Sequence, residues 1–214
     1  MITRNVIPEL LDHLAPDNPE AMRSRRDLRR INFLMGNESW ICKTLRPFRR
    51  LADRGITEIG AGDGHLINRL TTLFPEVSIQ AYDLAPRPET LDVRVRWNQG
   101  DVFKAKKSDA SGILVANLFL HHFQEEALGE LGKWFEDFDL LVFNEPDRAR
   151  LPHILGWGLH PWINRVTQHD MHVSINAGFA EGEIPRFLKL DAFRWQIRET
   201  CTWRGGRHVL AWRR

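Results

Sequence analysis

The stretch from Ile56 to Gly64 constrains the fold more than any other part of the chain. It begins with Ile-Thr-Glu-Ile, a run of mainly apolar or β-branched residues, and stops at three glycines spaced Gly-x-Gly-x-Gly. Glycine is favoured where the backbone turns sharply, and where no Cβ can stand between the chain and a ligand. An amphipathic stretch, Leu66 to Phe74, follows directly. This order predicts a strand, a tight turn and a helix.

The rest of the chain continues the alternation of strand and helix. Such alternation implies right-handed βαβ units and a parallel sheet covered on both faces. The tail differs, because two strand-like runs flank Trp203-Arg204-Gly205-Gly206, a pattern typical of an antiparallel hairpin. We predict strands over residues 56–59, 77–82, 93–97, 112–118, 138–143, 193–200 and 207–212, and helices over 64–74, 88–91 and 124–135.

Residues 1–50 are predicted to form a helical cap on the same domain as residues 51–214. One helix should begin at Asn18-Pro19 and end at Gly36, and a second should cover residues 38–51. Between residues 23 and 50 there are nine Arg or Lys residues against Asp27 and Glu38. Such a patch could attract RNA, an anionic lipid surface or an acidic substrate. The simpler interpretation is a solvated helix face, with Leu28, Ile31, Leu34 and Met35 turned inward.

Composition narrows the class of protein. No segment has the ~18 uncharged apolar residues that a membrane span needs, and the first residues lack the apolar core of a secretory signal. Cys42 and Cys201 are far apart and match no metal spacing. The sequence therefore predicts a cytoplasmic protein with no transmembrane segment, for which peripheral membrane contact stays open and the oligomeric state is undetermined.

A glycine-rich turn after the first strand can bind either of two classes of cofactor. A dinucleotide site has Gly-x-Gly-x-x-Gly facing a pyrophosphate, whereas here the third glycine comes one residue early and His65 takes the place of the last glycine. Glu58, just before the turn, suits an amine better than a pyrophosphate. Asp83 ends the second strand about 20 residues on, the spacing at which a carboxylate reaches ribose hydroxyls.

The Glu-x-Gly-x-Gly-x-Gly run and its spacing to Asp83 resemble the first motifs of class I S-adenosylmethionine (SAM)-dependent methyltransferases. The resemblance implies an α/β fold, a Rossmann-like doubly wound seven-stranded sheet with a C-terminal hairpin. It also implies that Asp101 and Val102 hold the adenine, and that Asn117 and Leu118 line the methionyl end of SAM. The implied cofactor-binding residues are Glu58, Gly60, Ala61, Gly62, Gly64, Asp83, Leu84, Asp101, Val102, Asn117 and Leu118.

A second resemblance concerns the acceptor. Asn117-Leu118-Phe119-Leu120-His121-His122-Phe123 is similar to the Leu-His-His-Phe/Trp segment of small-molecule methyltransferases such as the ubiquinone and menaquinone enzymes. Two further segments, residues 31–40 and 164–179, resemble a bacterial subgroup often placed with quinone, polyketide or lipid pathways. The segment from Asn117 to Phe123 follows the fourth predicted strand and so lies at the carboxyl edge of the sheet, where open α/β folds bind ligands. His121 or His122 is thus expected to contact the acceptor, with histidine suited to act as a base near neutral pH.

Residues 148–191 are predicted to be a substrate-side helical insertion. His169 within it is a further catalytic candidate, and we expect Glu145 rather than its neighbour Asp170 to orient it, because adjacent residues do not face each other on a helix. The tryptophans of the insertion, Trp157 and Trp162, suit stacking on a planar acceptor. No His-x-x-x-His pair sits beside a third ligand, so no metal site is predicted.

The function that these patterns favour is transfer of a methyl group from SAM to a small, aromatic, phenolic or quinone-like acceptor, at oxygen or carbon. A nucleic-acid methyltransferase is disfavoured, because Asn117 is followed by Leu-Phe-Leu and not by the proline and aromatic residues that clamp a flipped base. A non-catalytic SAM-binding module is disfavoured because the glycines and both acids are intact.

Overall fold

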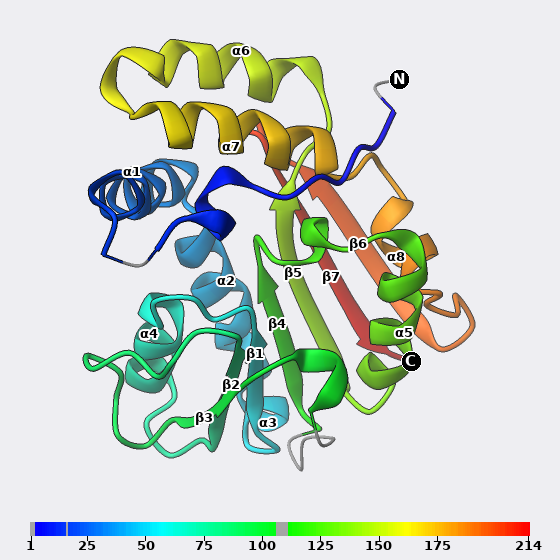
Figure 1. Ribbon diagram of the computed structural model, residues 1–214. Helices are drawn as coiled ribbons and strands as arrows, with labels where there is room; N and C mark the ends of the chain where they lie inside the picture. The colour runs from blue at the N-terminus through cyan, green and yellow to red at the C-terminus, as the bar shows by residue number, and fades with distance from the viewer. Residues whose placement is uncertain (1–2, 16, 106–110) are drawn as a thin grey trace.

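A seven-stranded sheet in the order β3-β2-β1-β4-β5-β7-β6 forms the centre of the molecule. The structure is a computed structural model that describes residues 3–15, 17–105 and 111–214. Strands β1 to β5 pair in parallel, whereas β7 runs antiparallel to both β5 and β6. The prediction of a Rossmann-like doubly wound sheet with a C-terminal hairpin is confirmed (Figure 1). The strands are β1 (Ile56–Ile59), β2 (Ile79–Asp83), β3 (Arg96–Gln99), β4 (Ile113–Asn117), β5 (Leu140–Pro146), β6 (Trp195–Cys201) and β7 (Gly206–Arg213).

Helices cover both faces of the sheet, and each face has its own apolar core. Ile41 of α2 and Ile67 of α4 belong to one cluster, with Ile56 of the sheet. Phe135 of α5 and Phe187 of α8 belong to the other. The described α-helices are α1 (Pro19–Met35), α2 (Asn37–Leu45), α3 (Arg49–Ala52), α4 (His65–Leu73), α5 (Glu125–Phe135), α6 (Arg150–Leu159), α7 (Arg165–Ala177) and α8 (Glu183–Phe187). Short 3₁₀ turns are η1 (Leu10–His13), η2 (Arg46–Phe48), η3 (Val102–Lys104), η4 (Leu120–His122) and η5 (His160–Trp162).

Three local predictions need correction. The helix expected over residues 38–51 is interrupted, because Pro47 cannot donate an amide hydrogen bond and a 3₁₀ turn separates α2 from α3. Residues 88–91 form a turn closed by the Leu91 amide on the Pro88 carbonyl, not a helix. β3 begins at Arg96, later than predicted, because Asp92 accepts from the Arg94 amide and guanidinium and fixes a turn there.

Strand β5 is longer than predicted, and this places polar groups inside the molecule. It runs to Pro146 and is buried along its whole length. Asn144 and Glu145, expected in a loop after the strand, are therefore its last core residues, each with 0% exposure. A carboxylate at such a position must find hydrogen-bond donors, because burial of an unpaired charge is very costly.

The N-terminal segment and helices α1, α6 and α7 lie together beyond the carboxyl edge of the parallel strands (Figure 1). Helix α7 packs on both α6 and α1. The Arg4 guanidinium fastens the start of the chain, since it donates to the Ala177 and Phe123 carbonyls at 2.8 Å each and lies 4.6 Å from the Phe179 ring centre. Across the described ranges, no helix combines the length and apolar character needed to cross a bilayer.

Candidate functional site

The glycine turn after β1 has the backbone geometry that its sequence predicts. Gly60, Gly62 and Gly64 all adopt positive φ, at 69°, 55° and 73°. A Cβ on Gly60 would stand 2.1 Å from Cδ2 of Phe119, so a side chain is excluded by space as well as by conformation. The turn therefore brings the backbone close to the Asn117–Phe119 segment, which leaves β4 at the same edge of the sheet.

Glu58 provides the most informative electrostatic feature of this edge. Its residue exposure is 2%, and its Oε2 atom has no hydrogen-bond partner among the described residues. Burial raises the pKa of the carboxyl well above its ordinary value, and the nearby Glu38, Asp83 and Asp63 carboxylates raise it further. Because Glu58 lines a pocket, a cationic amine entering there would satisfy the unpartnered oxygen and favour the ionised form of the carboxyl.

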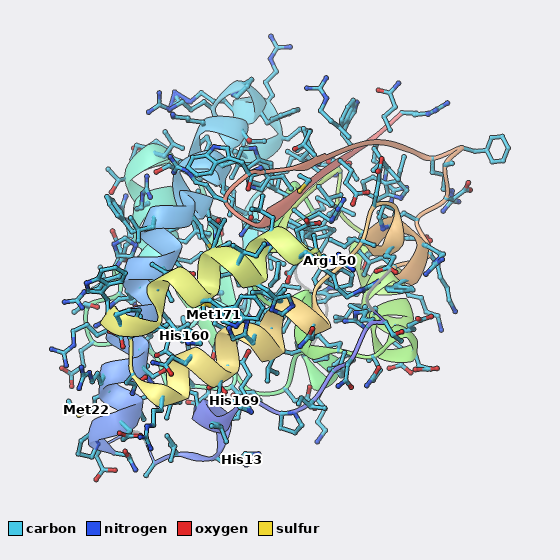
Figure 2. The ribbon with its side chains drawn as sticks, turned by 90° about the horizontal axis from the view of Figure 1, so that it is seen from above. His13, Met22, Arg150, His160, His169 and Met171 are labelled. Carbon is cyan, nitrogen blue, oxygen red and sulfur yellow. The ribbon has the colours of Figure 1, made fainter. Side chains whose placement is uncertain are left out.

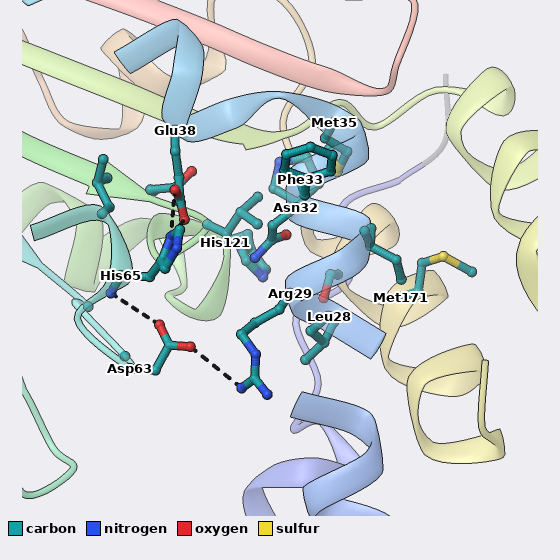
Figure 3. A pocket seen from close by; sticks show the side chains of 18 of the residues that line it. Leu28, Arg29, Asn32, Phe33, Met35, Glu38, Asp63, His65, His121 and Met171 are labelled. Atoms are coloured by element: carbon teal, nitrogen blue, oxygen red, sulfur yellow. Dashed lines mark hydrogen bonds and ion pairs between the residues drawn. The ribbon is translucent and has the colours of Figure 1, made fainter. Parts of the chain in front are cut away.

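A pocket of about 1070 Å³ extends from the glycine turn to the helices beyond the sheet edge. Figure 3 shows His65 bonded to Glu38 beside the turn, with His121 deeper between the turn and α1. The far end has apolar walls from three helices: Leu28, Phe33 and Met35 of α1, Leu159 of α6, and Met171 and Ile175 of α7. The volume is large enough for a nucleoside-sized ligand together with a small second molecule.

Six of the predicted cofactor residues line this pocket, and five do not. Those that line it are Glu58, Gly60, Ala61, Gly62, Asn117 and Leu118; Gly64, Asp83, Leu84, Asp101 and Val102 lie outside its lining. Asp83 Oδ2 accepts from the Gly62 amide at 2.7 Å and its Oδ1 from the Ala85 amide at 2.8 Å, so this carboxylate holds the glycine turn. Asp101 accepts from the Phe103 amide at 3.0 Å and begins η3.

The end of β4 carries a strained residue. Leu118 has a φ of +55°, a backbone conformation that is strained for a residue with a Cβ. Its amide donates to the Asn144 carbonyl at 2.8 Å. The Asn144 side-chain amide in turn donates to Asn117 Oδ1 at 2.8 Å. These contacts with β5 hold Asn117 and Leu118 in the pocket wall.

Glu145 organises the segment that follows. Its Oε1 accepts from the amides of Phe119 at 3.0 Å and Leu120 at 2.8 Å, and its Oε2 lies 2.8 Å from Nδ1 of His121. On the other side of the ring, Nε2 of His121 faces Glu9 Oε1 at 3.8 Å. His121 thus lies between two carboxylates, one from the sheet and one from the N-terminal segment.

This arrangement favours the charged form of His121. Burial opposes a charge on the ring, but the hydrogen bond that the ring donates to Glu145 and the nearby Glu9 carboxylate outweigh it and raise the pKa of His121 to about 9. A group protonated at neutral pH and engaged through Nδ1 is poorly suited to remove a proton. Of the two histidines predicted to act on the acceptor, His121 is therefore better placed to position the segment than to be a base.

The raised pKa of His121 predicts a pH dependence of stability. Because the folded-state pKa, about 9, exceeds the unfolded value of about 6.5, the contribution of His121 is complete below pH 6.5 and is lost as pH rises through 9. We expect the free energy of unfolding of the His121→Gln variant to fall less than that of the wild type between pH 6.5 and 9. Urea unfolding at several pH values measures this, and parallel curves for the two proteins would contradict the assignment.

His122 differs from its neighbour. It lines the pocket and remains accessible, although partial burial and the adjacent His121 charge lower its pKa. Its ring centre is 4.2 Å from that of His121. A neutral imidazole that faces the pocket can accept a proton at physiological pH.

The structure corrects the expectation for His169. Its Nδ1 lies 2.9 Å from Asp170 Oδ1, so the neighbouring residue, and not Glu145, holds the ring. Asp170 also accepts from the Leu10 and Leu11 amides at 2.7 and 2.9 Å and so anchors the N-terminal segment. His169 does not line the pocket. Met171, two residues further along α7, does line it, and its side chain lies against α6 near Gly156 (Figure 2). His169 thus does not meet His121 and Glu145.

The tryptophans of residues 148–191 are also placed differently from the prediction. Trp157 and Trp162 are mostly exposed and do not line the pocket. The apolar wall is supplied mainly by aliphatic side chains, methionines and Phe33.

Sequence reasoning missed Glu9 and Ser174. Glu9 accepts from the Ser174 hydroxyl and faces His121, and all three residues line the pocket. Burial opposes ionisation of Glu9, but its contacts with His121 lower the pKa of the carboxyl below the ordinary value. No local pattern marks Glu9, because its partners are more than 100 residues away in the chain.

Glu9, His121 and His122 also form a group whose ligand atoms lie within 4.8 Å of one another. Such a group has the residue types of a metal site. The proton that His121 carries between two carboxylates already balances part of their charge, and a metal ion would have to displace it.

Comparison of the sequence with protein-family models found no match, and comparison with curated proteins found none either. Solved structures do match. The plantazolicin methyltransferase BpumL, in complex with a monoazolic desmethylPZN analog and SAH, has a TM-score of 0.69 at 10% identity, over 92% of this chain and 91% of that one.

Two other solved structures match with lower TM-scores. The pyocyanin biosynthetic protein PhzM matches with a TM-score of 0.62 at 19% identity, over 97% of this chain and 62% of that one. Human N-acetylserotonin methyltransferase in complex with SAM matches at 0.51 and 13% identity, over 94% and 61%. At such identities the likeness shows the fold. Together with the observed strand order, it shows that this chain has the class I SAM-dependent methyltransferase fold.

Proposed function

We propose that the protein is a SAM-dependent methyltransferase that acts on a small aromatic, phenolic or quinone-like acceptor. The observation that carries the proposal is the buried Glu58 carboxylate, which has an unpartnered oxygen in a pocket beside the positive-φ glycine turn. SAM bears an ammonium group that suits this oxygen, and its sulfonium supplies an activated methyl group. The solved structures with the same fold, bound to SAM or SAH, support this choice of cofactor.

The residues of this chain divide into two groups under the proposal. Glu58, Gly60, Ala61, Gly62, Asn117 and Leu118 would hold the cofactor at one end of the pocket. The other end, with apolar walls from α1, α6 and α7, would enclose the acceptor and exclude water. In-line displacement requires the acceptor atom about 3 Å from the methyl group, so these walls chiefly orient it.

His122 is the proposed base for a hydroxyl acceptor. It is accessible from the pocket and has a lowered pKa, so it is neutral when an acceptor hydroxyl must lose its proton. His121, fixed by Glu145 and Glu9, is the proposed positioning residue.

The proposal is tested first by calorimetric titration of SAM into the wild-type protein and into the Glu58→Gln and Glu183→Gln variants. Glu183 pairs with Arg148 away from the pocket and serves as the matched control. We expect one SAM per chain in the wild type and about tenfold weaker binding when the Glu58 charge is removed. Equal affinity in both variants would contradict the assigned role of Glu58.

The role of His122 is tested in single-turnover methyl transfer once an acceptor is found among phenols and quinols. We expect the His122→Gln variant to react about a hundredfold more slowly, at the lower end of the contribution of a general base. SAM affinity should be unchanged. An unchanged rate would exclude His122 as the base.

We also expect no metal requirement. Dialysis against excess chelator should leave the methyl-transfer rate unchanged, because transfer from a sulfonium needs an oriented acceptor and, for a hydroxyl, a base. Loss of activity that zinc or manganese restores would instead assign a metal to Glu9, His121 and His122.

A further inference from the structure

The mouth of the pocket is surrounded by exposed apolar side chains. Phe33 at the end of α1 lines the pocket and is still 82% exposed. Its neighbour Leu34 is 57% exposed, although its helical spacing predicted an inward position. The buried face of α1 is formed by Ile31, as predicted, together with Ala21, Ser24 and Asp27.

Helix α6 contributes the opposite side of the mouth. From Leu151 to Leu159 it has no charged residue, although it lies on the outside of the molecule (Figure 2). Pro152, Gly156 and Leu159 line the pocket, whereas Leu151, Ile154 and Leu155 are exposed large apolar residues. A helix that is apolar on all sides is normally buried, so an exposed one indicates a surface that something covers.

The hairpin between β6 and β7 joins these two sides. Arg204 donates to the Leu34 carbonyl at 2.9 Å, and a Cβ on Gly205 would stand 3.1 Å from Cβ of Pro152. Trp203 in the same turn is 71% exposed. We define the apolar rim as Phe33, Leu34, Leu151, Ile154, Leu155 and Trp203, which lie on three segments joined by these contacts: α1, the hairpin and α6.

The charge on these segments is mainly positive. Arg25, Arg26, Arg29 and Arg30 belong to α1, and Arg204 belongs to the hairpin. The acids of α1 are Glu20, which is exposed in its first turn, and Asp27, which is 2% exposed and accepts from the Asn164 amide. Arg29 also pairs with Asp63 of the glycine turn, at 3.6 Å and largely exposed. A partner that covers the rim must thus be apolar at its centre and negative around it.

A second copy of the chain fits this surface poorly. A two-fold dimer through the rim would bring arginines of one copy against arginines of the other. A bilayer with anionic headgroups fits both properties, because exposed aliphatic and aromatic side chains enter the interface while arginines contact the phosphates.

We propose that the apolar rim docks on an anionic lipid surface with the pocket mouth facing the bilayer. An acceptor dissolved in the lipid would then enter the pocket without crossing water, a step that rests on the proposed function. The surface itself does not depend on that function.

The test is flotation of the full-length protein with vesicles. Vesicles of equal parts phosphatidylcholine and phosphatidylglycerol should carry the protein, pure phosphatidylcholine vesicles should carry much less, and added salt should weaken the binding. Absence of binding to either vesicle would overturn the proposal.

Matched variants locate the surface. Leu34→Ser combined with Ile154→Ser, neither residue lining the pocket, should weaken binding at least tenfold. The control Val93→Ser with Phe193→Ser, at still more exposed apolar sites elsewhere, should not weaken it. Arg26→Gln should weaken it about fivefold, and the control Arg198→Gln should have no effect. Equal effects of rim and control variants would contradict the assignment.

Two further measurements separate the alternatives. Sedimentation of the wild type without lipid should give the mass of the monomer. If the wild type is instead a dimer, and the Leu34 and Ile154 changes dissociate it, a second copy covers the rim and the proposal is overturned. SAM titration of the same preparations reports separately on the proposed function. A protein that floats with anionic vesicles but does not bind SAM would refute that function and leave the lipid surface established.

Discussion

Replacing Glu145 by alanine is expected to lower the free energy of unfolding by about 3–5 kcal/mol, because removing one partner leaves a buried polar group uncompensated. The variant would orphan the amides of Phe119 and Leu120 and remove the main partner of the His121 ring. For a chain of this length such a loss lowers Tm by roughly 10 °C. Thermal and urea unfolding measure it.

Two further variants show whether the loss belongs to this network. Glu145→Gln keeps the acceptor oxygen for the amides but removes the charge, so it should cost less than alanine and should reduce the pH dependence attributed to His121. Glu136→Gln removes an exposed carboxylate paired with Arg194 and should cost below about 0.5 kcal/mol. If Glu145→Ala cost no more than Glu136→Gln, the described network would not stabilise the fold.

Replacing Gly60 by alanine is expected to weaken SAM binding by about a hundredfold or more. Two effects add: positive φ costs a residue with a Cβ about 1–2 kcal/mol, and the overlap with Phe119 costs about 1–3 kcal/mol in displaced structure. Both reshape the turn that borders the cofactor end of the pocket. Calorimetric titration measures the affinity.

Gly182 provides the control. It has φ of +76°, but a Cβ there would meet no described atom within 4 Å, and the residue lies outside the pocket. Gly182→Ala should therefore lower stability slightly and leave SAM affinity unchanged. A similar loss of SAM affinity in both variants, or no loss in either, would show that the glycine turn has no specific role in cofactor binding.

The sequence predicts the sheet and the glycine turn well because both depend on local pattern. Gly60, Gly62 and Gly64 are needed by the backbone itself, and the apolar runs of β1, β4 and β5 reflect burial on both faces. Strand ends are harder to predict, since Asn144 and Glu145 are polar residues that the strand carries into the core.

The acceptor end of the pocket could not be predicted to the same extent. Glu9 reaches His121 across the fold, and Asp170 holds the N-terminal segment through the Leu10 and Leu11 amides, so both roles depend on contacts remote in sequence. The buried face of α1 is predicted only in part: Ile31 is buried but Leu34 is exposed, and Ser24 and Asp27 are buried through hydrogen bonds to Thr167 and Asn164. Hydrophobic periodicity does not detect a helix held by such polar contacts.

Calorimetric titration of the wild-type protein with SAM and, separately, with NAD tests the central claim most directly. We expect saturable binding of one SAM per chain and no detectable binding of NAD, since the Glu58 carboxylate suits an ammonium and repels a pyrophosphate. Binding of NAD in preference to SAM, or binding of neither, would contradict it.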